Sequence, residues 1–114
     1  MTLKRVLECL PTIEKIARCR SNKRRADLLR EAKNCIFFAI SEISLNVLNG
    51  NIRVSSYRKK QLKPHSSKIR KIADRKISLP LRKKLIIQSG GFLSSLLIPS
   101  ITLLADLVAR RYLK

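Results

Sequence analysis

The sequence predicts a small all-α protein, and three observations lead to this expectation. Apolar residues recur at spacings of three and four along the first half of the chain, which is the period of one helix face. Serine and asparagine residues stand where such stretches begin, and their side chains can cap helix N-termini. The 114 residues suffice for one small domain or a few helical pieces. We therefore expect a helical part over residues 1–50, a basic part over residues 51–90 and an apolar helical part over residues 91–114.

The first helix should be amphipathic. Its apolar face consists of residues that are mostly three or four apart, namely Leu3, Val6, Leu7, Leu10, Ile13, Ile16 and Ala17. Pro11 interrupts this face, so we expect either a kink or two short helices. Ser21 and Asn22 can cap a second helix, which would begin near Lys23 and run through Leu29.

A denser apolar stretch covers residues 34–48. The stripe that a helix would bury consists of Phe37, Ile40, Ser44 and Val47, widened by Ile36, Ile43 and Leu48. The sequence Asn49-Gly50-Asn51 then supplies a helix stop with a glycine that can adopt a left-handed conformation. We expect a core helix here, with a helix that binds a partner as the alternative.

The middle of the chain carries most of the charge. The whole protein has 26 Lys and Arg residues against 7 Asp and Glu residues, a net charge of +19. Thirteen of the basic residues fall in residues 51–90, where Asp74 is the only acid. Such a charge favours polyanionic partners, nucleic acid first and anionic membranes second.

Short basic helices joined by turns are the structure we expect over residues 51–90. A serine in Ser55-Ser56 can cap one helix, a serine in Ser66-Ser67 can cap the next, and Ser78 can cap a third with Pro80 in its first turn. The alternative is a segment that is disordered in the absence of a polyanion.

These helices would separate apolar from basic side chains. In the second of them Ile69 and Ile72 would face inward, with the basic residues outside: Lys68, Arg70, Lys71, Arg75 and Lys76. In the third, Leu81, Leu85 and Ile86 would face inward, and the basic triplet would face outward: Arg82, Lys83 and Lys84.

A basic segment of this kind is suited to the backbone of double-stranded DNA. Tyr57 is its only aromatic residue, whereas single-strand binding uses several aromatic side chains as stacking platforms. No recognition-helix, zinc-finger or RNA-binding-sheet signature is present. The predicted nucleic-acid-binding residues are all the basic side chains of the segment: Arg53, Arg58, Lys59, Lys60, Lys63, Lys68, Arg70, Lys71, Arg75, Lys76, Arg82, Lys83 and Lys84.

No motif in the sequence assembles a catalytic site, and we expect neither an enzyme nor a cofactor. The chain has one histidine, His65, and no nucleophile or phosphate-loop motif. Its three cysteines, Cys9, Cys19 and Cys35, lack the paired spacing of zinc ligands, so we expect no metal site. Cys9 and Cys35 stand among apolar residues and are interpreted as small buried side chains. An odd number of cysteines fits a reducing compartment such as the nucleus or cytosol.

The C-terminal part contains an apolar run. The chain carries no charge from Leu85 to Ala105, but Pro99 and several hydroxyl side chains interrupt the run and Asp106 ends it. A membrane-spanning helix needs about 20 predominantly apolar residues, whereas the apolar stretch from Phe92 to Ala105 has only 14. Packing or self-association through residues 92–108 is therefore favoured, with interfacial membrane contact and a membrane span as alternatives.

Residues 39–52 and residues 78–93 are separated by a Lys/Arg-rich stretch, and an apolar run follows them. In this order they resemble stretches of small basic proteins encoded by Polinton/Maverick elements and their adintovirus relatives. The junction Gly90-Gly91, followed by Phe92, also resembles the adenovirus core peptide precursor X (mu), in which a basic DNA-condensing part precedes Gly-Gly and a hydrophobic tail.

The resemblance implies a virion core protein that binds and condenses double-stranded DNA in the virion core and the host nucleus. It also implies a viral cysteine protease that cuts after Gly91, so that Gly90, Gly91 and Phe92 form a predicted processing site. An uncut hinge and an ordinary helix stop are the alternatives at this junction. A membrane-active viral protein and a host-type nucleic-acid-binding module are the alternative functions.

Overall fold

The computed structural model describes the backbone of residues 3–89 and 91–112 and the side chains of residues 8–89 and 91–103. Within these residues the only regular elements are helices, which confirms the predicted all-α fold. In chain order they are α1 (Leu3–Ala17), α2 (Asn22–Arg30), α3 (Asn34–Leu48), α4 (Ser56–Leu62), the 3₁₀ helix η1 (Lys63–His65), α5 (Ser66–Ala73), α6 (Leu79–Ile87) and α7 (Phe92–Tyr112).

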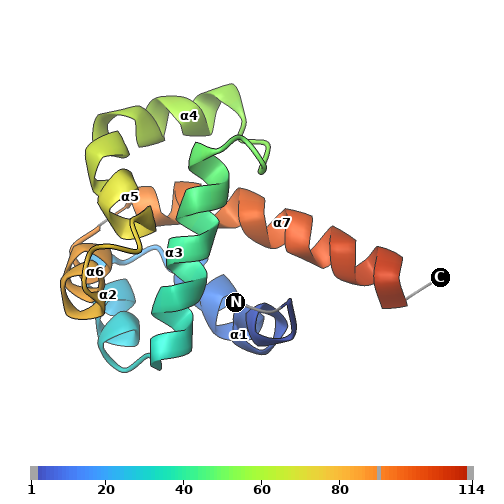
Figure 1. Ribbon diagram of the computed structural model, residues 1–114, viewed down its shortest axis with the longest axis horizontal. Helices are drawn as coiled ribbons and strands as arrows, with labels where there is room; N and C mark the ends of the chain where they lie inside the picture. The colour runs from blue at the N-terminus through green and yellow to red at the C-terminus, as the bar shows by residue number, and fades with distance from the viewer. Residues whose placement is uncertain (1–2, 90, 113–114) are drawn as a thin grey trace.

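Helix α3 lies at the centre of the molecule (Figure 1) and contacts α1, α5, α6 and α7. The predicted stripe is buried at Phe37, Ile40 and Ser44, and the Ser44 hydroxyl donates to the carbonyl of Ile40 at 2.8 Å. Leu48 does not belong to the buried stripe, because it lies in the last turn of α3 and 40% of it is exposed. The stretch over residues 34–48 is therefore a core helix.

One core joins the three parts of the chain that the sequence distinguishes. Residues from each part belong to it: Cys9, Ile13 and Ile16 from α1, Phe37 and Ile40 from α3, Ile69, Ile72 and Ile86 from the basic helices, and Leu93, Leu96 and Leu97 from α7. The basic helices are therefore fixed on an apolar core that they help to form.

Several predicted helix ends are confirmed and one is wrong. The Ser21 hydroxyl accepts from the backbone N–H of Arg24 at 3.2 Å, and the Ser55 hydroxyl accepts from that of Arg58 at 3.3 Å. Gly50 ends the α3 turn with a φ of 75°. Ser66 does not cap α5, because η1 runs directly into this helix and His65 occupies the cap position.

The third predicted cap residue, Ser78, stands at the expected position but does not make the expected hydrogen bond. Ser78 precedes α6 and Pro80 lies in the first turn, but the Ser78 side chain makes no capping hydrogen bond.

In α1, Pro11 lies inside one helix, so the expectation of two short helices is wrong. Pro11 is itself exposed, while Cys9 and Ile13 on either side of it are buried in the same core. This shared burial holds the helix together across the missing N–H donor.

The side chains predicted to face inward and outward do so in α5, but the prediction fails for two residues of α6. In α5, Ile69 and Ile72 are buried and the basic side chains around them are exposed. In α6, Leu81 is 49% exposed and Arg82 is only 7% exposed, the reverse of the prediction. Positions 79, 82 and 86 recur at the period of one helix face, and Leu79 and Ile86 pack against the core. This register turns Arg82 inward and Leu81 outward.

Helix α7 packs into the core through its first ten residues. Phe92, Leu93, Leu96, Leu97 and Ile101 are buried, and the helix contacts α1, α3 and α4. After them Thr102 and Leu103 are exposed, and Figure 1 shows the C-terminal part of α7 extending away from the other helices. Among the described residues no single helix has the length and apolar composition of a membrane span. The segments Leu79–Ile87 and Phe92–Leu103 meet that measure only as a pair bent by 105°.

Ile40 tests whether α3 holds the fold together. The substitution Ile40→Asp should lower the free energy of unfolding by about 3–5 kcal/mol, because it places an unpaired carboxylate where the wild-type side chain is fully buried. The matched control is Leu81→Asp, which introduces the same charge at an exposed leucine. Urea unfolding followed by circular dichroism measures both. Equal stability of the two variants would contradict the central position of α3.

Candidate nucleic-acid interface

The basic segment forms a contiguous group of helices. Helix α4 continues into η1, η1 contacts α5, α5 contacts α6, and α6 contacts α2. Figure 1 shows α2, α5 and α6 on the side of the molecule away from the protruding end of α7, with α4 along the top. Helix α2, which is far from α6 in the sequence, thus lies beside the basic segment.

Ten of the thirteen predicted nucleic-acid-binding residues are exposed. Ile69 and Ile72 anchor α5 to the core, so the basic residues between and beside them are held outward by the helical period. The exposed residues are Arg53, Lys59, Lys60, Lys63, Lys68, Arg70, Lys71, Arg75, Lys76 and Lys84. Arg58 and Lys83 are half-buried, and Arg82 is buried.

Most of these exposed cations have no acidic partner within the described part of the chain. Arg75 forms an ion pair with Glu42 of α3, and the other two described ion pairs, Arg18–Glu14 and Arg30–Asp27, lie outside the basic segment. The carboxylate of Asp74 accepts from the backbone N–H of Lys76 at 2.9 Å and so stabilises the turn after α5. Nine exposed cations of the segment therefore remain free to meet an external anion.

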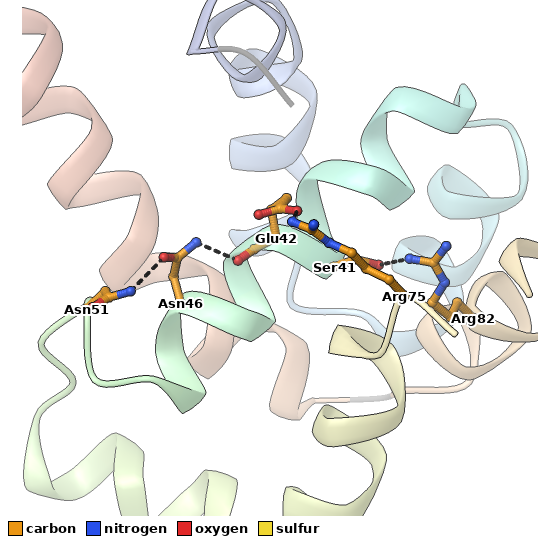
Figure 2. A network of polar contacts seen from close by, with 6 residues as sticks. All are labelled: Ser41, Glu42, Asn46, Asn51, Arg75 and Arg82. Atoms are coloured by element: carbon orange, nitrogen blue, oxygen red, sulfur yellow. Dashed lines mark hydrogen bonds and ion pairs between the residues drawn. The ribbon is translucent and has the colours of Figure 1, made fainter. Parts of the chain in front are cut away.

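Arg82 is buried inside the fold and does not belong to the exposed basic surface. Its Nε donates to the carbonyl of Ile77 at 3.0 Å, and its Nη1 donates to the Ser41 hydroxyl at 3.1 Å (Figure 2). Its guanidinium carbon lies 5.9 Å from the centroid of the Phe38 ring. These contacts tie α6 and the preceding loop to α3, so Arg82 is not placed to contact a phosphate. Lys83 is similarly drawn inward, with its Nζ 5.2 Å from the Phe37 ring centroid.

A short chain of amide contacts positions the start of the basic segment. The Asn46 side-chain amide donates to the carbonyl of Glu42 at 2.8 Å, and the Asn51 amide donates to Asn46 Oδ1 at 3.0 Å (Figure 2). The backbone N–H of Asn51 also donates to the Asn46 carbonyl at 2.9 Å. These bonds fix the turn at Gly50, from which the chain leaves α3 toward Arg53 and α4.

Helix α2 adds exposed cations next to the basic segment, and the sequence did not predict this contribution. Lys23 and Arg24 are exposed on this helix, which contacts α6. Arg25 is instead buried, and its Nη1 donates to Asn22 Oδ1 at 2.7 Å while its Nη2 donates to the Ser94 hydroxyl at 3.1 Å. Lys23, Arg24 and Arg25 are consecutive basic residues, so the sequence does not show which of them is buried. The tertiary contacts of α2 with α6 and α7 decide this.

The predicted processing site is partly described. Gly90 lies outside the described residues, Gly91 is exposed, and Phe92 is buried with its ring stacked on His65 at a centroid distance of 4.5 Å. A protease that binds residues on both sides of the Gly91–Phe92 bond would have to separate this ring pair. Cleavage after Gly91 stays a prediction.

The three cysteines are free thiols, and two of them are neighbours that sequence spacing does not reveal. Burial raises the pKa of the Cys9 thiol to about 11, with further contributions from a hydrogen bond with Cys35 and from the charges of Cys35 and Glu8. Cys9 belongs to α1 and Cys35 to α3, so this contact lies between two core helices. No group of three or more potential metal ligands occurs among the described residues.

Comparisons with protein families, with curated proteins and with solved structures found no match to this chain.

Substitution of Arg82 tests whether its buried hydrogen bonds stabilise the fold. The substitution Arg82→Ala should lower the free energy of unfolding by about 2–4 kcal/mol, because it removes two hydrogen bonds made by a charged group and leaves the buried Ser41 hydroxyl without this donor. Lys84→Ala is the matched control on the exposed side of the same helix and should change stability by about 0.5 kcal/mol or less. Urea unfolding would contradict the assignment if both variants were as stable as the parent.

The raised pKa of Cys9 predicts slow thiol alkylation. At about pH 8 iodoacetamide should modify the half-exposed Cys19 well before Cys9, because the thiolate is the reactive form and burial also blocks access. Peptide mass spectrometry measures the labelling, and urea should make the two sites equally reactive.

The same pKa shift predicts a pH dependence of stability. Because the pKa of Cys9 rises from 9.0 to about 11 on folding, the contribution of this thiol to stability is present below pH 9 and is lost as the pH rises toward 11.

Proposed function

We propose that the protein binds and condenses double-stranded DNA without catalysing a reaction, as a core protein of a virus or virus-like transposable element. The observation that carries the proposal is the basic segment over residues 51–90, whose helices α4, η1, α5 and α6 are contiguous. The segment holds nine exposed cations without ion-pair partners among the described residues. The virion core, the host nucleus and the viral cysteine protease enter the proposal only through the resemblance noted in the sequence.

Binding would be driven by the DNA backbone. Each Lys or Arg that neutralises a phosphate releases condensed counterions, so affinity accumulates without reading of bases. Tyr57 is exposed but is the only aromatic residue of the segment, which disfavours base stacking as the main interaction. Salt should therefore weaken binding strongly, and base sequence should affect it little.

Condensation is supported by the size and charge of the protein. Duplex DNA carries about one negative charge per 1.7 Å of its axis, so a net charge of +19 matches about 32 Å of duplex. The described protein measures 40 × 31 × 30 Å. One molecule thus neutralises a length of DNA comparable with its own dimensions, and a row of such molecules would remove most of the repulsion between neighbouring duplexes.

Charge reversal on α5 tests the proposal. The triple variant Lys68→Glu, Arg70→Glu and Lys71→Glu should bind DNA much more weakly than the parent, and the slope of log affinity against log salt should fall by about 2–3 units if all three contact phosphates. The three side chains are exposed, and the helix is anchored by Ile69 and Ile72, so the fold should persist.

The matched control reverses three exposed cations outside the basic segment, by Lys15→Glu, Arg20→Glu and Lys33→Glu. It changes the net charge by the same amount and should retain most of the affinity and most of the salt slope. Fluorescence anisotropy with unrelated duplex sequences measures binding, and light scattering measures condensation. Equal losses in both variants, or one duplex bound far more tightly than the others, would contradict the proposal.

A membrane-active function is the second candidate, and the observation that favours it is the exposure of Leu103 in α7. Its discriminating measurement is liposome flotation alongside the DNA titration. Flotation of the parent protein with anionic vesicles, together with weak and salt-insensitive DNA binding, would favour this candidate over the first.

A further inference from the structure

A cavity of about 390 Å³ lies between the end of α3, the loop that follows it, α4 and α5. Its apolar lining comes from Val47, Leu48, Ile52, Val54, Leu62 and Ile69. Val54, Leu62 and Ile69 are each at least 92% buried and form its floor, whereas Leu48 is 40% exposed and belongs to its outer wall. The volume falls in the range of small-molecule sites, about 300–1,000 Å³.

The charged part of the lining is entirely positive. Arg53, Lys59 and Lys63 line the cavity, all three are exposed, and none of them forms an ion pair within the described part of the chain. No acidic residue lines it, and Ser66 contributes a hydroxyl. An occupant that matches this lining has an apolar body and an anionic end.

The spacing of the cations favours one compact anionic group. Lys59 and Lys63 are four residues apart on the continuous run of α4 and η1, so they lie on the same side of that run. Leu62 of the same run provides apolar surface directly beside them. A single phosphate or carboxylate can therefore be reached by both lysines while an attached chain enters the cavity.

DNA does not supply such an occupant. Its backbone presents phosphates and sugars without an apolar chain, and the cavity has no aromatic side chain on which an unpaired base could stack. The cavity therefore calls for a ligand of a different class from the partner proposed above.

We propose that this cavity binds a single-chain amphiphile with an anionic headgroup, such as an alkyl phosphate or a fatty acid. The alkyl chain lies on Val54, Leu62 and Ile69, and the headgroup pairs with Lys59, Lys63 and Arg53. The site is independent of the proposed DNA function, although Arg53, Lys59 and Lys63 also belong to the predicted DNA-binding residues. Bound amphiphile and DNA therefore compete for these three cations.

The test uses octyl, decyl and dodecyl phosphate with the full-length protein, each below its critical micelle concentration, by titration calorimetry. One molecule should bind per protein, and the affinity should rise about fourfold for each added methylene, as expected when the chain enters an apolar site. Inorganic phosphate alone and uncharged dodecyl maltoside should each bind at least tenfold more weakly than dodecyl phosphate.

Two pairs of variants separate the cavity from the general positive charge. Leu48→Glu places an acid in the exposed wall and should weaken dodecyl phosphate binding at least tenfold, whereas Leu81→Glu, at an exposed leucine outside the cavity, should leave it unchanged. Lys59→Gln with Lys63→Gln should weaken binding, and Lys76→Gln with Lys84→Gln should not.

Several outcomes would overturn the proposal. They are binding of many amphiphile molecules per chain, equal effects of Leu48→Glu and Leu81→Glu, or no dependence on chain length. Tight binding of an acidic amphipathic peptide in the absence of alkyl phosphate binding would also overturn it and would assign the cavity to a protein partner. The Leu48→Glu variant should lose much less affinity for DNA than for dodecyl phosphate, because six of the nine exposed cations without ion-pair partners in the described basic segment lie outside the cavity. Failure here is therefore distinguishable from failure of the DNA proposal.

Discussion

Burial of α3 against four other helices is the constraint on which the rest of the structure depends. A chain with a net charge of +19 repels itself, and the described residues form only three ion pairs to offset this repulsion. Apolar contact has to supply the cohesion instead. Phe37, Ile40 and Ser44 lie where the three parts of the chain meet, so the basic helices can keep their cations outside only while this contact persists.

Arg82 and Arg25 show how the fold tolerates positive charge inside it. Both are less than a tenth exposed and both donate to carbonyl or hydroxyl oxygens, Arg82 to Ile77 and Ser41 and Arg25 to Cys19 and Ser94. Such acceptors satisfy guanidinium donors without neutralising their charge. The buried Arg82 guanidinium is thus hydrogen-bonded without an ion pair among the described residues. An external polyanion that binds only the folded state would stabilise the whole molecule.

The sequence predicts much of the helical structure and of the exposed basic surface. The period of residues 34–48, the glycine after them, the caps at Ser21 and Ser55 and the two faces of residues 66–73 are local signals, and the structure confirms them. The inward turn of Arg82 was not predictable, because three consecutive basic residues look alike until Leu79 and Ile86 fix the helix register. The cavity and the Cys9–Cys35 contact were also missed, because each joins elements whose relative placement depends on tertiary packing.

The packing of α7 changes what a backbone cut after Gly91 would do. Phe92, Leu93, Leu96, Leu97 and Ile101 would all belong to the short C-terminal fragment, yet each is buried in the core of the remainder. A nicked molecule would therefore be a non-covalent heterodimer, in the manner of fragment complementation. Its stability would depend on protein concentration, whereas that of the intact chain does not. At high protein concentration the two fragments would stay associated, and dilution would let them dissociate.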